Sequence, residues 1–117
     1  MAGNPPKFKP EDAAFRLLRE GDIEGFNRYK ASGGEMDLTH CDFRGVDFRG
    51  IEAAGLDLSG CYFRQADLRG VDFSQAVLEG ASINGALISG TYFPPELTAE
   101  EIDLSLMHGT RMRYSKS

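Results

Sequence analysis

The sequence between Met36 and Pro95 repeats every five residues, and this period constrains the fold more than any other feature. The segment divides without gaps into twelve units: MDLTH CDFRG VDFRG IEAAG LDLSG CYFRQ ADLRG VDFSQ AVLEG ASING ALISG TYFPP. An α-helix repeats about every 3.6 residues and a β-strand every two, so a period of five fits neither. The segment therefore needs a different kind of backbone path.

Apolar residues occupy fixed positions within the five-residue unit. The first position is always apolar or small, and the third is large and apolar in eleven of the twelve units, Ala53 being the exception. In an extended backbone these two positions point the same way, and the others face outward. We therefore expect a core built from Leu38, Phe43, Phe48, Leu58, Phe63, Leu68, Phe73, Leu78, Ile83, Ile88 and Phe93.

Glycine ends eight of the twelve units. Glycine adopts positive φ at no steric cost, so its recurrence at the fifth position indicates a corner. A short extended piece followed by a corner every five residues winds the chain into a coil. One unit cannot bury its apolar pair alone, so the coils must stack and share a core.

The units CDFRG, VDFRG and ADLRG resemble the pentapeptide-repeat family, whose consensus is a small residue, Asp or Asn, Leu or Phe, and two variable residues. The resemblance covers residues 36–95. It implies an all-β solenoid, a right-handed quadrilateral β-helix with four units per coil, and twelve units would give about three coils.

Helical caps are expected at both ends, because an open solenoid exposes unpaired strand edges and core ends. We divide the chain into an N-terminal helical cap (1–35), the repeat segment (36–95), and a C-terminal helix with its tail (96–117). We expect the last residues, RYSKS, to be frayed.

Helix signals support these caps. In PEDAAFRLLREG, Glu11 and Asp12 are expected in the first helical turn. Asp22 is a good N-cap for a second helix, IEGFNRYKASG. In TAEEIDLSLMHG, Thr98 and Glu101 have the spacing of a capping box.

With four units per coil, residues twenty apart lie above one another, and the outward side chains form four faces. The first face comprises residues 36–40, 56–60 and 76–80, the second 41–45, 61–65 and 81–85, the third 46–50, 66–70 and 86–90, and the fourth 51–55, 71–75 and 91–95.

The arginines of the repeats form two short ladders on neighbouring faces. Arg44 and Arg64 lie on the second face, and Arg49 and Arg69 lie on the third. Together with Asp47 and Asp67 they form a candidate stripe for binding a carboxylate, a phosphate or a partner protein, for which arginine forks are suited. Alternatively, each arginine is a solvated residue screened by its own aspartate.

The aspartates at the second position have a local role as well, because Asp side chains hydrogen-bond nearby backbone groups at corners. We expect this Asx-type bonding to explain why aspartate recurs there.

Two further sets of residues need an account. Cys41 and Cys61 are twenty apart and point inward, so we expect two buried free thiols that act as small hydrophobes.

Val77, Leu87 and Tyr92 are outward apolar residues of the last coil. Either the C-terminal helix covers some of them, or they form an interface with a partner or a second copy.

No motif for catalysis or phosphate binding occurs, so we expect no enzyme, cofactor or metal site. The net charge of −5 argues against nucleic acid and leaves open a basic protein partner. The N-terminus has no apolar secretory signal and no apolar run of about 18 residues occurs. We therefore expect a cytoplasmic protein of bacterial type, as a monomer or homodimer.

The expected function is a non-enzymatic interaction module that binds an unidentified protein through its β-helix wall. The resemblance also implies an alternative, because the best-understood family members imitate B-form DNA, bind DNA gyrase and protect it from quinolones. The chain could be such a DNA mimic for gyrase or another nucleic-acid-binding protein. The arginines on the second and third faces depart from that pattern.

Overall fold

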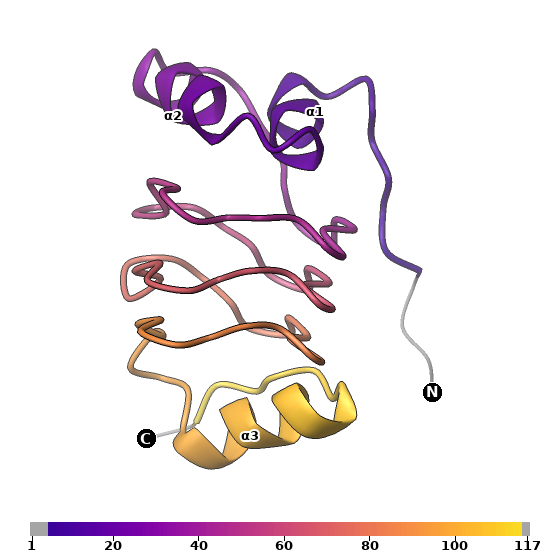
Figure 1. Ribbon diagram of the computed structural model, residues 1–117, viewed down its shortest axis with the longest axis vertical. Helices are drawn as coiled ribbons and strands as arrows, with labels where there is room; N and C mark the ends of the chain where they lie inside the picture. The colour runs from indigo at the N-terminus through magenta and orange to yellow at the C-terminus, as the bar shows by residue number, and fades with distance from the viewer. Residues whose placement is uncertain (1–4, 116–117) are drawn as a thin grey trace.

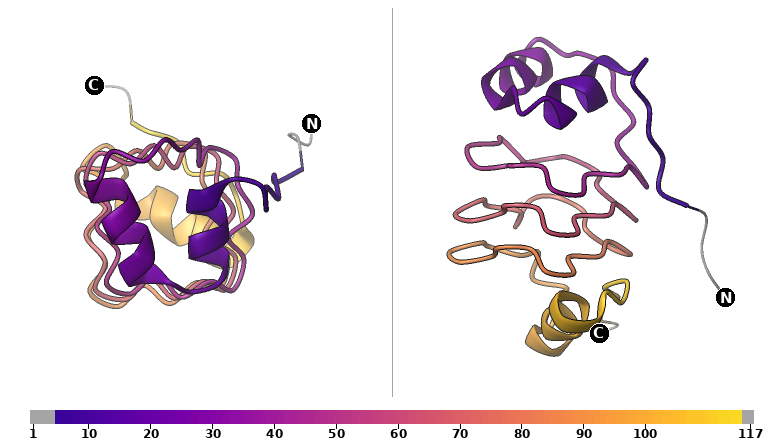
Figure 2. Two further views of the ribbon diagram at one scale, coloured as in Figure 1. Left: turned by 90° about the horizontal axis from the view of Figure 1, so that it is seen from above. Right: turned by 45° about the vertical axis from the view of Figure 1, so that its right-hand side comes forward.

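The computed structural model describes residues 5–115 of the 117. Residues 36–95 wind into three stacked coils, with two helices at the N-terminal end of the stack and one at the C-terminal end (Figure 1). Seen along the stack, the coils superimpose on a four-sided outline (Figure 2). Within the described residues, no helix has the length and hydropathy needed to cross a membrane.

Isolated parallel bridges join the coils, and six of them connect residues that are twenty apart, such as Asp42 with Tyr62 and Tyr62 with Ser82. The Phe43 N–H donates to the Tyr62 carbonyl (2.9 Å), and the Tyr62 N–H donates to the Cys41 carbonyl (3.0 Å). A corner every five residues leaves too few extended residues for a longer ladder. The coils are therefore linked by single bridges, and the expected all-β solenoid contains no continuous strands within residues 5–115.

The corners require left-handed backbone geometry. Gly45 has φ of 73°, and the other corners with glycine are similar. His40 and Gln65 take the place of glycine at two fifth positions, and both have φ of 60°. Since residues with a Cβ seldom adopt this conformation, the stacking of the coils fixes the corner, and glycine lowers its cost.

The expected core residues point inward. Nine of the eleven are buried, whereas Ile88 and Phe93 are only half-buried. Stacked phenylalanine rings run through the centre: the ring centroids of Phe43 and Phe63 are 5.9 Å apart, and Phe48 meets the ring of each at 5.3 Å. Phe15 from the first helix continues this column, 5.5 Å from Phe43. The cap and the coils therefore share one core.

Two short helices cover the N-terminal end of the stack: α1 (Ala13–Arg19) and α2 (Ile23–Ala31). Asp22 is the N-cap of α2, as predicted, and accepts from the Gly25 N–H (2.9 Å). The prediction that Asp12 lies in the first turn of α1 is wrong, because its carboxylate caps the helix by accepting from the Phe15 N–H (3.0 Å). Glu11 precedes this cap and also lies outside the first turn.

Groups outside the repeats complete the upper edge of the first coil. Lys7 forms a parallel bridge with Cys41, so the extended segment before α1 continues the second face. On the fourth face the Asn27 side chain of α2 replaces a missing strand: it accepts from the Glu52 N–H (2.9 Å) and donates to the Gly50 carbonyl (3.0 Å).

The C-terminal end is covered by α3 (Ala99–His108). Thr98 caps it by accepting from the Glu101 N–H (3.2 Å), as predicted. The reciprocal half of the capping box is absent, because the Glu101 carboxylate instead accepts from the backbone and guanidinium of Arg113 (2.9 and 3.2 Å). Gly109 ends the helix with φ of 74°.

After α3 the chain turns back along the last coil. The Gly80 N–H donates to the Met112 carbonyl (2.7 Å), and the Leu78 N–H donates to the Tyr114 hydroxyl (2.9 Å). The Ser115 N–H donates to the Glu96 carbonyl (2.9 Å). The prediction of a frayed tail is therefore wrong for residues 113–115, because Arg113 bonds Glu101 of α3, Tyr114 bonds the edge of the last coil, and Ser115 bonds Glu96. Residues 116 and 117 lie outside the described part of the chain.

The C-terminal helix leaves the outward apolar residues of the last coil uncovered. Val77, Leu87 and Tyr92 are 40%, 50% and 65% exposed. They lie on the first, third and fourth faces, so they do not gather on one face. Because α3 closes the end of the stack instead of a side, the expectation that it covers some of them is wrong (Figure 1).

Candidate interaction surface

Every aspartate at the second position of a repeat unit bonds the backbone of its own unit. In each case the carboxylate accepts from the N–H two residues further on, at 2.9–3.2 Å. This is the Asx-type bonding expected from the sequence, which is confirmed. The pairs are Asp37–Thr39, Asp42–Arg44, Asp47–Arg49, Asp57–Ser59, Asp67–Arg69 and Asp72–Ser74.

Where the fourth position is arginine, the same aspartate also binds its guanidinium. Arg44 holds Asp42 through Nε (2.9 Å) and NH2 (2.8 Å), in the two-pronged geometry typical of strong arginine–carboxylate pairs. Burial of Asp42 disfavours its charge, but the hydrogen bonds from Arg44 outweigh this effect and lower the pKa of the carboxyl. Within these units the arginine therefore neutralises its own aspartate.

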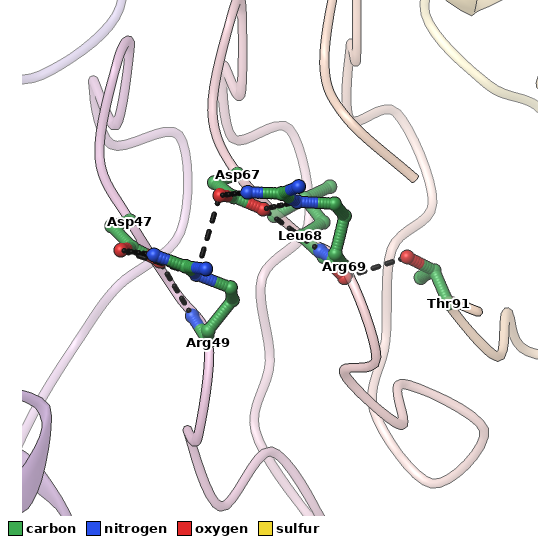
Figure 3. A network of polar contacts seen from close by, with 6 residues as sticks. All are labelled: Asp47, Arg49, Asp67, Leu68, Arg69 and Thr91. Atoms are coloured by element: carbon green, nitrogen blue, oxygen red, sulfur yellow. Dashed lines mark hydrogen bonds and ion pairs between the residues drawn. The ribbon is translucent and has the colours of Figure 1, made fainter. Parts of the chain in front are cut away.

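On the third face the ladder is neutral and cross-linked (Figure 3). Arg49 pairs with Asp47 at 2.8 Å and reaches Asp67 in the next coil at 3.3 Å, while Arg69 pairs with Asp67 at 2.7 Å. The hydrogen bond from the Arg69 side chain, helped by the charge of Arg49, lowers the pKa of Asp67 to about 2. Two arginines and two aspartates thus cancel on this face.

The second face breaks the pattern, because Tyr62 takes the place of an aspartate. Arg64, two residues further on, forms no ion pair and no side-chain hydrogen bond with any residue between 5 and 115. The Tyr62 ring instead carries Arg111 from the C-terminal segment, whose guanidinium carbon lies 4.9 Å from the ring centroid and which also donates to the tyrosine hydroxyl. The second face therefore holds more positive charge than its neighbours.

A hollow of about 460 Å³ lies on the second face, where the N-terminal cap meets the coils. Arg19 from the end of α1 donates to the Arg44 carbonyl (2.7 Å) and lies 5.8 Å from the ring of Phe8. Phe8 itself is 60% exposed. We call this site the arginine hollow; its lining includes Phe8, Arg19, Asp42, Arg44, Arg64 and Gln65.

Two of the seven lining residues could not be assigned from the repeats. Phe8 and Arg19 lie in the N-terminal cap, outside the five-residue phase that sorts the faces. The sequence does show that Tyr62 stands where other units have aspartate, and this identifies Arg64 as the arginine with no ion-pair partner in the described part of the chain. Of the six residues in the expected stripe, the structure brings Arg44 and Arg64 together at the hollow and ties Arg49, Arg69, Asp47 and Asp67 into the neutral ladder.

The first and fourth faces carry acidic side chains. Asp37, Asp57 and Glu79 lie on the first face, and Glu52 and Asp72 lie on the fourth. Within the described part of the chain, no three His, Cys, Asp or Glu side chains come close enough together to hold a metal ion.

The two cysteines are free and buried, as predicted. Burial raises the pKa of Cys41 to about 11 and that of Cys61 to about 12. The Cys61 thiol also donates to the Leu38 carbonyl at 2.8 Å. Both groups stay protonated at neutral pH, and a thiol nucleophile needs the opposite.

Comparison with known proteins agrees with the repeat geometry. The family model of pentapeptide repeats matches residues 57–93, in eight copies. Comparisons with curated proteins and with solved structures give no significant match. The match begins in the second coil, and the bridges place the preceding units of the first coil in the same twenty-residue repeat. Residues 57–93 of the chain are therefore pentapeptide repeats.

Proposed function

We propose that this protein is a non-enzymatic interaction module, a right-handed quadrilateral β-helix that presents its second face to a partner protein. The handedness is the one general to pentapeptide repeats. One observation carries the choice of face: the arginines of the third face pair with aspartates, whereas Arg64 on the second face pairs with no carboxylate among residues 5–115. An exposed, unpaired guanidinium on a rigid wall is suited to recognition.

The rigidity of the wall supports this role. Backbone hydrogen bonds link each coil to the next, and the phenylalanine column fills the interior. The backbone of such a frame loses little freedom on binding, because it is already ordered. A cytoplasmic setting fits the two free thiols, since disulfides are rare there.

The proposal is tested by quantitative affinity capture from the host. The double variant Arg44→Gln, Arg64→Gln should lose the captured partner, whereas the matched variant Arg49→Gln, Arg69→Gln should retain it. Far-UV circular dichroism and a urea midpoint establish that both variants are folded. If both double variants capture the same proteins as the wild type, the second face is not the binding surface.

The alternative is a DNA mimic that binds gyrase or another nucleic-acid-binding protein. Its support is the acidic first and fourth faces, which would meet a basic partner. Three coils span only about 15 Å along the stack, at about 4.8 Å per coil, and this is short for a DNA imitation. A gyrase supercoiling assay tests this alternative. Inhibition by the wild type that is lost in the double variant Asp57→Asn, Asp72→Asn would favour the DNA mimic. If the protein neither inhibits gyrase nor protects it from a quinolone, the DNA-mimic function is excluded.

A further inference from the structure

We propose that the arginine hollow binds an extended acidic segment of the partner protein, with Arg64 as its main anchor. This inference rests on the proposed function and adds the chemistry of the partner. It differs from the basic partner that the net charge of −5 leaves open. The local charge at the surface of contact decides which partner binds there.

The arginines of the hollow have hydrogen-bond donors to spare. A guanidinium has five N–H donors in a planar fork that matches a carboxylate. Arg64 uses none of them on residues 5–115, while Arg44 commits only Nε and NH2 to Asp42. Arg19 uses NH1 on backbone carbonyls, which anchors it beside the hollow. Several guanidinium N–H donors on one small surface are therefore free to bind a ligand.

The charge around the hollow is locally positive. Three arginines line the hollow, and the one carboxylate among its lining residues in the described part of the chain is Asp42, whose side chain is 11% exposed and already paired with Arg44. The surface is thus positive on a negative protein. The first face beside it is acidic and the third face is neutral, so only a ligand confined to the second face gains from these charges.

This confinement distinguishes a peptide from a nucleic acid. A duplex carries phosphate charge on all sides of a wide rod, and it would bring phosphates against the acidic first face. An extended peptide can follow a single face and place carboxylates only where the arginines lie. The geometry therefore favours a protein segment rich in Glu or Asp.

The hollow also has an apolar part, the ring of Phe8. Phe8 is 60% exposed, yet its ring is held edge-on against Phe15 with centroids 5.1 Å apart. An exposed aromatic ring that is fixed in place offers contact area at a small entropic cost. We expect an apolar side chain of the partner segment to pack against Phe8, beside the carboxylates that bind the arginines.

The experiment uses the full chain and a fluorescein-labelled octaglutamate peptide, with binding followed by anisotropy at low salt. The wild type should bind, and added salt should weaken the binding. Arg64→Gln should weaken it about tenfold, the loss expected for one charge-assisted contact of about 1.4 kcal/mol. Arg69→Gln is the matched control, because Arg69 has the same place in its unit but already pairs with Asp67; it should change binding less than about twofold.

Three results would overturn the inference: no binding of octaglutamate by the wild type, equal effects of Arg64→Gln and Arg69→Gln, or equally tight, Arg64-dependent binding of a short DNA duplex. Failure here and failure of the proposed function are distinguishable. If octaglutamate does not bind but capture still depends on the second face, only the acidic chemistry is wrong. If capture is independent of the second face as well, both proposals fall.

Discussion

Replacing Ser105 by alanine should destabilise the protein by about 2–4 kcal/mol, because one hydroxyl joins α3, the last coil and the returning tail. Ser105 is fully buried; its Oγ accepts from the Ile83 N–H at 3.0 Å and donates to the Thr110 carbonyl at 2.6 Å. Alanine leaves both backbone groups without this partner. A buried polar group left unpaired costs about 1–3 kcal/mol.

Two effects keep the expected loss below the sum of two full penalties. Thr110 is exposed, so water can reach its carbonyl more easily than the Ile83 N–H. Alanine also has a higher helix propensity than serine, which returns about 0.5 kcal/mol. A loss of this size is a large part of the 5–15 kcal/mol typical of a domain, but it leaves the variant folded in buffer.

The measurement is urea unfolding followed by far-UV circular dichroism, with linear extrapolation to zero denaturant. Ser89→Ala is the matched control, since Ser89 is exposed and lies on the same coil as Ile83. This substitution should change the free energy of unfolding by less than about 0.5 kcal/mol. If Ser105→Ala is as mild as Ser89→Ala, the coil edge at Ile83 does not depend on the hydroxyl, and the account of this cap is wrong.

Three other outcomes are expected. Phe63→Ala should lower the free energy of unfolding by about 3–5 kcal/mol in the same urea assay, since its ring is fully buried between Phe43 and Phe73; a loss below about 1 kcal/mol would contradict the column. The pKa of Asp67 in the folded state, about 2, lies below its unfolded value near 4. The contribution of its ionised carboxylate to the free energy of unfolding is therefore fully present above about pH 4 and is lost as the pH falls toward 2. Nuclear magnetic resonance titration of its carboxyl carbon checks this, and a midpoint near 4 would refute the ladder. Cys41 and Cys61 should resist a thiol reagent in the native protein at pH 8 and react fully in urea, and rapid native labelling would show that they are accessible.

The repeat segment could be predicted in detail because the five residues of each unit specify the local conformation of that unit. An inward residue at the third position and a corner at the fifth recur with every unit. A wrong assignment in one unit therefore does not shift the assignment of the other units. The Asx bonds of residues such as Asp57 and Asp72 follow from the same local pattern. Periodicity therefore predicts both the path of the backbone and the direction of each side chain.

The ends could not be predicted in this way. Lys7 pairs with a residue 34 positions away, and Met112 pairs with one 31 positions away, and neither segment shows any period. Their conformation depends on which edge groups of the coils lack a partner. The arginine hollow has the same origin, because Phe8 and Arg19 reach the second face only after the cap has docked on the coils.

Asn27 and Met112 allow a conclusion about chain length. Both complete the outer coils, and the middle coil contributes to neither edge. An inserted copy of residues 56–75 would stack between the outer coils and leave both end closures intact. The length of this molecule is thus adjustable in steps of one coil, while its closed ends block the edge-to-edge growth that exposed strands invite.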